Sequence, residues 1–535
     1  MPSSLTLLMA QINPTVGAVE SNANKIIQII TSQQSKHDII VFPELALTGY
    51  PLEDLIYRDR LFTQIEDALE KIAASAKHCH VVLGHPSKIE KNIFNTASIL
   101  FKGHRIREYH KQHLPNYGVF DEKRYFTPGK AIPCLFTVKG HRLAICICED
   151  AWERGPVEDV IKSNADILIS INASPFELNK YQQRIDLMQH YAKLGLAIVY
   201  VNQIGGQDEL VFDGRSFAMD SHGDLVAQAP AFTEHLHTIT YQHNQFTSDT
   251  APALNEPALI YQALVCGLRD YVNKNNFNEV LLGLSGGIDS ALTLAIAVDA
   301  LGASQVTAIL MPSQYTATMS NEDALTQIKL MGVEHLTLSI EKPFETILSI
   351  LKPAFSDYAV DTTEENIQAR IRGMLLMALS NKTGKMVLST SNKSETAVGY
   401  ATLYGDMCGG FSVLKDVYKT TVYTLAAYRN SITPVIPERV ITRAPSAELA
   451  PNQTDQDSLP DYPTLDAIIR HYMEEKLDMA GIVALGYDKE IVLRIINLIT
   501  RNEYKRRQAA PGVKITPCAF GRDWRYPITK AYSSV

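Results

Sequence analysis

Short runs of β-branched and other apolar residues alternate along the chain with longer segments in which apolar residues recur every three or four positions. The short runs are typical of buried strands, and the longer segments are typical of amphipathic helices. The pattern weakens over residues 243–257, where the segment HNQFTSDTAPALNEP is polar and contains two prolines. We therefore predict an α/β protein with two domains, residues 1–242 and 258–535, joined by a linker at 243–257.

The two halves differ in how the predicted elements follow one another. In the first half, strands are predicted at 4–12, 37–43, 80–86, 95–101, 141–148, 166–173 and 197–205, with a closing hairpin in FDGRSFAMDSHGDLVAQ (212–228). In the second half, strands at 279–284, 306–312, 335–340 and 385–390 alternate with helices such as 288–301 and 366–382. This alternation with short loops predicts a doubly wound parallel sheet in the second half.

Composition is that of an ordinary globular protein, since 46% of the 535 residues are hydrophobic and 20% are charged. Lys and Arg total 50 and Asp and Glu total 58, which gives a net charge of −8. Because there is no basic excess to neutralise phosphates, a general nucleic-acid or membrane-surface partner is not expected. No segment approaches the roughly 20 apolar residues that span a bilayer, and the N-terminus lacks a basic leader. These features predict a cytoplasmic protein.

A glycine-containing loop follows the first predicted strand of the second half. Strand EVLLGL leads directly into SGGIDS (285–290) and then into a helix. Glycines let the backbone approach a ligand closely, and a helix N-terminus offers free N–H donors to an anion. A tight strand–helix turn is the structural alternative. The lysine of a Walker A loop is absent, and a carboxylate beside a phosphate requires a cation between them, so we infer a Mg²⁺ site.

The SGGIDS loop resembles the pyrophosphate loop of the PP-loop ATP pyrophosphatases. These enzymes cleave ATP between the α and β phosphates and adenylate a carboxylate or carbonyl oxygen. Three further segments, NIQARIR (366–372), STSNKSE (389–395) and GYATLYGDMCGGFSVLKDVYK (399–419), together with the loop resemble NAD⁺ synthetases over residues 259–535. The resemblance implies a Rossmann-like doubly wound sheet and the substrates ATP and deamido-NAD⁺.

The same resemblance implies a set of site residues. ATP is expected to contact Gly283, Leu284, Ser285, Gly286, Gly287, Ile288, Asp289, Ser290, Thr390, Lys415 and Ser446. Deamido-NAD⁺ is expected to contact Asn366, Arg370, Glu395 and Lys505, and Mg²⁺ is expected to bind Asp289 and Glu395. Asn366 and Arg370 share a helix face at i, i+4 spacing. A solvated helix face is the alternative interpretation there and in the basic run at 502–507.

Seven cysteines, an odd number, do not indicate a disulfide framework. Cys146 and Cys148 form a C-x-C pair, but no second pair or histidine cluster completes a zinc site. Cys148 ends one predicted strand, Glu44 follows another in FPEL, and Lys111 precedes a turn in YHKQHLP. We predict that Cys146, on the same strand face two residues earlier, is a packed core residue. Taken singly, Glu44 is also compatible with a cap and Lys111 with a surface charge.

As an ordered set, Glu44, Lys111 and Cys148 resemble the catalytic residues of the nitrilase, or carbon–nitrogen hydrolase, superfamily over residues 1–240. The resemblance implies an α-β-β-α sandwich. A thiolate is the attacking species, so a neighbouring base must take its proton. Glu44 can be that base, and Lys111 can stabilise the oxyanion that forms.

The glutamine-using members of that superfamily suggest further residues. By resemblance, Tyr117, Ser174 and Lys180 are expected to bind glutamine, with a plain loop turn as the alternative at Ser174. A Cys-His dyad is a second alternative for the catalytic group, because His104, His110 and His113 occur near Lys111. No cysteine-protease pattern surrounds these histidines.

Both motif sets, in this order, resemble the glutamine-dependent NAD⁺ synthetases along nearly the whole chain. The expected reaction uses glutamine and ATP to amidate deamido-NAD⁺, and the resemblance implies a homo-oligomer. One alternative is an amidotransferase of the GMP synthetase type, which pairs the loop with a Cys-His-Glu glutaminase that we do not find. The other is a nucleotide-sensing module with a vestigial amidase, against which the intact candidate residues argue.

Overall fold

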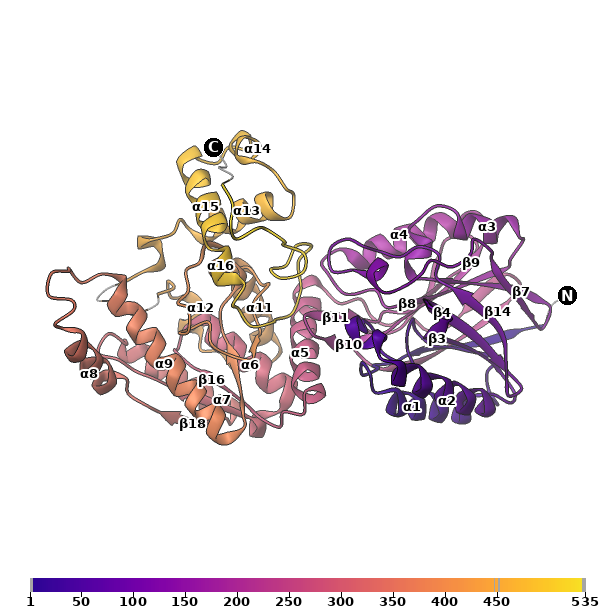
Figure 1. The fold of residues 1–535 in the computed structure, drawn as a ribbon, viewed down its shortest axis with the longest axis horizontal. Coiled ribbons are helices and arrows are strands. Elements are labelled where there is room, and N and C mark those ends of the chain that lie inside the picture. Colours follow the sequence, from indigo (N-terminus) through magenta and orange to yellow (C-terminus); the bar gives the residue numbers. More distant parts are fainter. Residues whose placement is uncertain (1–2, 447, 451–452, 532–535) are drawn as a thin grey trace. The chain divides into compact units, whose positions relative to one another are not determined.

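The computed structural model describes residues 3–446, 448–450 and 453–531. The chain forms two compact units, the first ending at Leu254 and the second beginning at Asn255 (Figure 1). A short strand lies inside the segment predicted as a linker, because β15 (Gln245–Thr247) pairs antiparallel with β14 (His235–Gln242). Within the described ranges, no helix is both long and apolar enough to cross a membrane.

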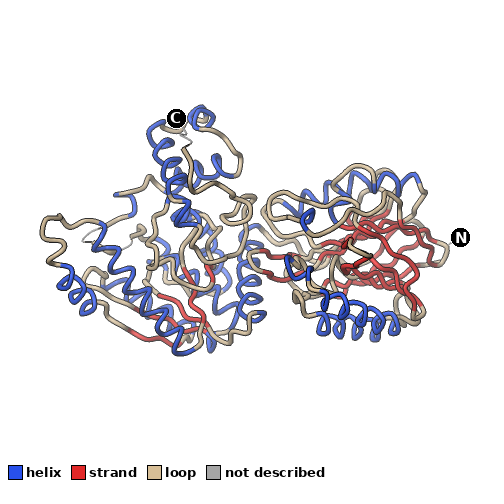
Figure 2. Tube along the Cα trace, in the orientation of Figure 1, coloured by secondary structure: helices blue, strands red, loops and turns tan. Residues whose placement is uncertain are grey.

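The first unit contains two stacked sheets, drawn in red in Figure 2. The seven-stranded sheet has the order β15-β14-β1-β2-β3-β4-β5, and the six-stranded sheet has the order β13-β12-β9-β8-β7-β6. Besides β14 and β15, the first sheet contains β1 (Leu5–Gln11), β2 (Ile39–Val41), β3 (His80–Ile89), β4 (Asn92–Phe101) and β5 (His104–His110). The second contains β6 (Cys134–Val138), β7 (His141–Ile147), β8 (Ile167–Asn172), β9 (Ala197–Asn202), β12 (Phe217–Met219) and β13 (Leu225–Gln228).

Helices cover the outer face of each sheet. Helices α1 (Val19–Gln33) and α2 (Asp59–Ser75) pack on the seven-stranded sheet, and α3 (Pro156–Lys162) and α4 (Lys180–Ala192) pack on the six-stranded sheet. Short pieces complete the unit: the ribbon of β10 (Ile204–Gln207) and β11 (Leu210–Asp213), and the 3₁₀ turns η1 (Glu53–Tyr57), η2 (Glu122–Arg124) and η3 (Cys148–Ala151).

The alternation of side chains along each strand explains this layering. In β1, Leu5, Leu7 and Met9 enter the core between the two sheets, whereas Leu8 and Ala10 enter the core beneath α1 and α2. Successive side chains of a strand point to opposite faces, so one apolar strand contributes to two cores. The α-β-β-α sandwich expected for the first half is confirmed.

The second unit is built on a five-stranded parallel sheet with the order β18-β17-β16-β19-β20. The strands are β16 (Val280–Gly283), β17 (Val306–Leu310), β18 (Glu334–Thr337), β19 (Met386–Ser389) and β20 (Phe411–Ser412). The chain leaves the central strand β16 toward β17 on one side and later places β19 on its other side. The doubly wound sheet is confirmed, and the carboxyl ends of β16 and β19 lie side by side, where such sheets bind ligands.

Helices surround this sheet. Leu376 of α9 packs on Leu281, Ile309 and Val387 of the sheet, and α6 contacts β16 and β17. The helices are α5 (Glu256–Lys274), α6 (Ile288–Leu301), α7 (Thr318–Met331), α8 (Glu341–Leu351), α9 (Thr362–Thr383), α10 (Lys393–Val398), α11 (Lys419–Ile432), α12 (Glu438–Thr442), α13 (Tyr462–Met473), α14 (Met479–Ala484), α15 (Lys489–Arg501) and α16 (Glu503–Arg506). Two 3₁₀ turns, η4 (Ala303–Gln305) and η5 (Asp455–Asp457), lie between them.

Candidate active sites

Three strand ends of the first unit bring Glu44, Lys111 and Cys148 together. Glu44 follows β2, Lys111 follows β5 and Cys148 follows β7. The Lys111 Nζ donates hydrogen bonds of 2.8 Å to Glu44 Oε1 and of 2.8 Å to Glu122 Oε1. All four residues are buried. Their charges therefore act on one another with little screening by water.

A glycine permits the approach of the Glu44 segment. A Cβ at Gly84 of β3 would lie 2.4 Å from the Pro43 carbonyl oxygen and 2.5 Å from the Leu45 backbone nitrogen. Any larger residue would push this segment off the sheet. Two donors then orient the carboxylate, because Asn95 Nδ2 lies 2.7 Å from Glu44 Oε1 and the Ala173 backbone N–H lies 2.8 Å from Oε2.

The backbone turns at Cys148. Strand β7 ends at Ile147, one residue earlier than predicted, and Cys148 has a φ of +46°. The prediction that the two cysteines share a strand face was wrong, because this turn takes Cys148 off the strand. Cys148 belongs to the core between the sheets, whereas Cys146 packs in the core beneath α3 and α4. The packing role predicted for Cys146 agrees with that position.

One buried carboxylate, Asp150, fastens this turn to the segment of Lys111. Its Oδ1 accepts hydrogen bonds of 2.9 Å from the backbone N–H groups of Gln112 and His113. Its Oδ2 accepts from the Tyr109 hydroxyl at 2.8 Å and from the Ile147 backbone N–H at 3.1 Å. The residues flanking Lys111 and the residue preceding Cys148 are thereby held by one side chain.

Burial shifts the protonation equilibrium of the Cys148 thiol. It raises the pKa of the Cys148 thiol well above its ordinary value, Glu44 raises it further, and Lys111 opposes both. The resting thiol is thus protonated, and attack requires a base. Burial also raises the pKa of Glu122 to about 7, with Lys111 lowering it and Glu44 raising it. Glu122 was missed in the sequence, where it lies in an irregular segment with no recognisable motif.

The three predicted glutamine-binding residues lie around this cluster. The Tyr117 hydroxyl donates to Glu149 Oε1 at 3.0 Å, and Lys180 Nζ lies 4.3 Å from the centroid of the Trp152 ring. Burial raises the pKa of Glu149, whereas Lys111, the Tyr117 hydroxyl and Lys180 act to lower it. The backbone N–H of Ser174 donates to Asn202 Oδ1 at 2.9 Å.

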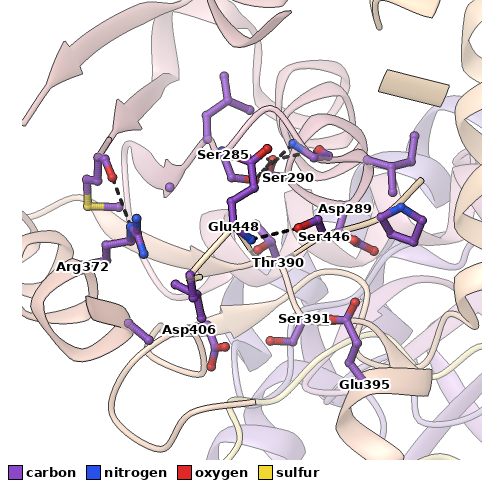
Figure 3. A pocket seen from close by; sticks show the side chains of 18 of the residues that line it. Ser285, Asp289, Ser290, Arg372, Thr390, Ser391, Glu395, Asp406, Ser446 and Glu448 are labelled. Atoms are coloured by element: carbon purple, nitrogen blue, oxygen red, sulfur yellow. Dashed lines mark hydrogen bonds between the residues drawn. The ribbon is translucent and has the colours of Figure 1, made fainter. Parts of the chain in front are cut away.

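In the second unit, a cavity of about 280 Å³ lies at the carboxyl ends of β16 and β19 (Figure 3). The predicted residues that line it are Gly283, Leu284, Ser285, Gly287, Ile288, Asp289, Ser290, Thr390, Glu395 and Ser446. Sequence analysis did not single out several other polar lining residues: Arg372, Asp406, Lys419, Arg443, Glu448 and Asp455. Figure 3 shows Arg372 and Glu395 on opposite sides of the cavity.

The SGGIDS loop forms one wall of this cavity. Gly286 has a φ of +79°, and a Cβ there would lie 2.2 Å from the Ser320 carbonyl oxygen, which explains the glycine although Gly286 does not line the cavity. The Gly287 backbone N–H donates to Ser285 Oγ at 3.2 Å, and Ser285 Oγ lies 3.1 Å from Ser290 Oγ. Gly287 is the N-cap of α6, so the N-terminus of this helix faces the cavity and favours an anion.

Asp289 and Glu395 are joined by a lysine that was not predicted. Lys419 Nζ donates to Asp289 Oδ2 at 2.5 Å and to Glu395 Oε1 at 3.0 Å. Asn392 caps α10 and also donates to Asp289 Oδ1 at 2.9 Å. Burial raises the pKa of Glu395 to about 7, with Lys419 lowering it and Asp289 raising it. Two carboxylates bridged by a cation suit Mg²⁺, which takes one or two protein carboxylates and completes its shell with phosphate and water.

Lys415, predicted to contact ATP, is buried and is not among the residues that line the cavity. Lys419, four positions later, lies on the cavity wall. The predicted deamido-NAD⁺ residues other than Glu395 also lie outside that lining. Asn366, Arg370 and Lys505 instead contact the loop 399–406.

Each of these three residues contacts that loop. Asn366 Oδ1 accepts from the Thr402 hydroxyl at 2.7 Å, and Arg370 Nε donates to the Leu403 carbonyl oxygen at 3.3 Å. Lys505 Nζ donates to the carbonyl oxygens of Gly399 and Ala401, each at 2.9 Å. The same loop carries Asp406, whose pKa burial raises to about 6.

Comparison with known proteins assigns a family to each unit. Residues 7–249 match the family model of carbon–nitrogen hydrolases, and residues 260–509 match that of NAD synthases. The fold and the two sites thus define a carbon–nitrogen hydrolase unit and an NAD synthase unit within one chain.

Full-length relatives define the family more closely. A glutamine-dependent NAD(+) synthetase of Acinetobacter baylyi is 48% identical over 99% of both chains, and one of Aquifex aeolicus is 43% identical over 99% of this chain and 100% of its own. The solved structure of glutamine-dependent NAD⁺ synthetase from Acinetobacter baumannii in complex with ADP is 47% identical, covers 98% of both chains and superposes with a TM-score of 0.81. The chain belongs to the glutamine-dependent NAD⁺ synthetase family.

Proposed function

We propose that this chain amidates deamido-NAD⁺ to NAD⁺, using ATP and the ammonia that it releases from glutamine. The observation that carries the proposal is the presence in one chain of a buried Glu44–Lys111–Cys148 cluster and of a loop-lined cavity bearing Asp289 and Glu395. We assign the amidase to residues 1–242, the ligase to 258–535 and the linker to 243–257. We call the first unit the amidase unit and the second unit the ligase unit.

In the amidase unit, Glu44 takes the proton of the Cys148 thiol as Sγ attacks the side-chain amide carbon of glutamine. The carbonyl π electrons move onto oxygen, and the Lys111 ammonium stabilises the resulting oxyanion. When the carbon–nitrogen bond breaks, Glu44 returns the proton to the leaving ammonia. Glu44 then activates a water molecule that hydrolyses the thioester to glutamate and free thiol. The raised pKa of Cys148 is the reason why the base is required.

In the ligase unit, a carboxylate oxygen of the nicotinate group attacks the α phosphorus of ATP, and the bond to the bridging oxygen of the β phosphate breaks. The SGGIDS loop and the N-terminus of α6 hold the departing pyrophosphate. Ammonia then attacks the carbonyl carbon of the acyl adenylate and loses a proton to solvent, AMP leaves, and the amide of NAD⁺ remains. Thr390 and Ser446, which line the same cavity, supply hydroxyls to the nucleotide.

The proposal includes Mg²⁺ held by Asp289 and Glu395. Bound there, Mg²⁺ would supply positive charge to the pyrophosphate that departs when the bond between the α phosphorus and the bridging oxygen breaks. Lys419 lines the same cavity and would add a second positive charge for the phosphates. We also propose that the chain acts in the cytoplasm. We further propose that it forms a homo-oligomer, and light scattering of the purified protein tests this oligomeric state.

Product analysis with one substrate varied at a time tests the function. The full chain with ATP, Mg²⁺ and deamido-NAD⁺ is expected to form NAD⁺, AMP and pyrophosphate with glutamine or with ammonium, and not without a nitrogen source. Pyrophosphate release with other carboxylates in place of deamido-NAD⁺ serves as the specificity control. If another carboxylate releases pyrophosphate and deamido-NAD⁺ does not, the assignment is wrong.

A further inference from the structure

Arg184 of α4 is a buried cation that the proposed reaction does not use. Its side chain is 1% exposed. Its Nε donates to Ser174 Oγ at 3.0 Å, and its Nη2 donates to the carbonyl oxygens of Ser174 at 2.9 Å and of Pro175 at 2.8 Å. Its Nη1 donates to Asp213 Oδ1 at 2.7 Å, which balances the charge inside the fold. Three of these four bonds converge on the loop that carries Ser174.

We propose that Arg184 is a positioning residue for glutamine, because it fixes the Ser174 hydroxyl as a hydrogen-bond donor to the substrate. This inference rests on the proposed function and on the expectation that Ser174 contacts glutamine. A guanidinium has five donors and no acceptor. In the bond with Arg184, the Ser174 Oγ must therefore accept, which turns the O–H proton away from the guanidinium.

The substrate group that meets this proton must be an acceptor. A hydroxyl rotates freely in solution, so an enzyme that needs it as a donor gains by fixing it before the substrate binds. Lys180 lies on the same helix one turn earlier, and burial together with the Arg184 guanidinium acts to lower the pKa of its ammonium, so a second cation stands close to Arg184. An oxygen of glutamine with negative or partial negative charge fits this corner.

The backbone of Ser174 has a second anchor that does not depend on Arg184. Asn202 accepts from the Ser174 backbone N–H at 2.9 Å and donates to its carbonyl oxygen at 3.1 Å. A substitution at Arg184 is therefore expected to change the hydroxyl more than the loop. Tyr200 is another polar group near Ser174 and a competing acceptor for its proton: burial raises the pKa of the Tyr200 hydroxyl, and a hydrogen bond with the Ser174 side chain acts to lower it.

Lysine is the informative substitution at position 184. It keeps a positive charge for Asp213, so the buried carboxylate is not left unpaired. A single ammonium cannot reproduce the planar fork that reaches Ser174, Pro175 and Asp213 together. We expect Arg184→Lys to raise the KM for glutamine about tenfold, the equivalent of one lost hydrogen bond to a charged group, with kcat nearly unchanged.

A double-mutant cycle with Ser174→Ala separates positioning from general structure. In the Ser174→Ala background, Arg184→Lys is expected to have no further effect on the KM, because the hydroxyl that it orients is gone. Arg215→Lys is the matched control, since Arg215 is a buried arginine whose guanidinium lies 3.2 Å from the centroid of the Tyr181 ring on the same helix. It is expected to leave the KM for glutamine unchanged.

Ammonium-dependent NAD⁺ formation by the same variants reports the ligase unit separately, and heat denaturation of each variant reports the fold of the amidase unit. Equal effects of Arg184→Lys with and without Ser174, or an unchanged KM, would overturn the inference. Should Arg184→Lys fail to fold, the paired variant Arg184→Gln/Asp213→Asn removes both charges and undergoes the same cycle. Failure of the proposed function looks different: wild-type protein would not hydrolyse glutamine, or Ser174→Ala alone would leave the KM unchanged.

Tyr200→Phe tests the competing acceptor. If the Ser174 proton is directed to the substrate, removal of the Tyr200 hydroxyl is expected to leave the KM unchanged or to lower it. The opposite result would be that Tyr200→Phe raises the KM for glutamine as far as Arg184→Lys does and that the double variant raises it no further. Tyr200 would then orient the hydroxyl, and the role assigned to Arg184 would be wrong.

Discussion

Both units place a lysine ammonium between two carboxylates, but the surroundings of the two lysines differ. In the amidase unit, Lys111 bonds Glu44 and Glu122, whose side chains are 1% and 4% exposed. Neutral donors also bind this group, because Asn95 bonds Glu44 and the Tyr50 hydroxyl bonds Glu122 at 2.9 Å, although Glu122 Oε2 has no hydrogen-bond partner among the described residues. Both carboxylates of the amidase triad are thus closed off from water.

In the ligase unit, Lys419 bonds Asp289 and Glu395, whose side chains are each 18% exposed and line the cavity. Here the lysine neutralises carboxylates that substrates and ions can reach. This difference in exposure shows that two similar charge triads can have different functions. The lysine of the closed triad pairs with carboxylates that are buried away from water, whereas the lysine of the open triad pairs with carboxylates on a cavity wall.

The largest expected effect comes from removal of the Cys148 thiol, which only the amidase unit is expected to need. Cys148→Ala is expected to lower glutamine-dependent NAD⁺ formation by about a thousandfold or more, because no other group can form the thioester. Ammonium at high pH supplies free ammonia directly, so ammonium-dependent NAD⁺ formation should persist at a substantial fraction of the wild-type rate. NAD⁺ is measured with each nitrogen source. Cys146→Ala, which alters only the core beneath α3 and α4, is the control and should keep glutamine use.

Substitution of Asp289 is expected to have the converse effect, in which the ligase reaction is lost and glutamine hydrolysis is retained. Asp289→Asn is expected to lower NAD⁺ formation about a hundredfold or more with either nitrogen source, because the metal and Lys419 both lose a charged partner. Glutamine hydrolysis should remain measurable as glutamate release. Wild-type NAD⁺ formation by this variant at ordinary Mg²⁺ concentration would contradict the assigned metal site.

Local, contiguous features were the ones that sequence could predict. The SGGIDS loop lies between a strand and a helix that are themselves strongly patterned, and α6 begins and ends where the helix 288–301 was predicted. The α-β-β-α sandwich followed from family resemblance and the doubly wound sheet from the alternation of strands and helices, and both were confirmed. The roles of the individual site residues stay predictions.

Features set by tertiary contacts were missed. Glu122 reaches Lys111 from the short 3₁₀ turn η2, and no sequence motif marks this residue. Lys415 and Lys419 lie in one stretch with similar surroundings in sequence, and only the start of α11 places Lys419 on the cavity wall. The turn at Cys148 depends on a positive φ that no pattern of strand residues reveals.

Removal of each lysine sharpens the comparison of the two triads. Lys111→Met leaves two carboxylates buried without a cation and is expected to destabilise the amidase unit by about 3–5 kcal/mol. Lys419→Met should destabilise the ligase unit less, since its carboxylates reach water, and Mg²⁺ with ATP should restore most of the loss. Melting temperatures with and without Mg²⁺ and ATP measure both. If both variants lose the same amount of stability, and Mg²⁺ with ATP restores neither, the distinction between a closed and an open triad is wrong.

The smallest expected effect is the pH dependence of the closed triad. Burial raises the pKa of Glu122 from its ordinary 4.5 to about 7, Lys111 lowers it and Glu44 raises it, with Tyr50 bonded to the same carboxylate. Between these two pH values the folded chain holds a proton that the unfolded chain has lost. The free energy of unfolding must therefore fall as pH rises through this window, by at most ~3 kcal/mol in total.

Glu122→Gln removes this titration while it keeps the shape of the side chain. The difference in unfolding free energy between wild type and variant is expected to shift against the wild type from pH 5 to pH 7 and to stay constant above pH 8, where Glu122 is ionised in both states. Chemical denaturation of the amidase unit at each pH measures the difference. The Lys111 ammonium keeps its bond to Glu44 in both proteins, so its contribution largely cancels. A difference that moves in favour of the wild type as pH rises would mean that Lys111 outweighs burial and that Glu122 is already ionised at low pH.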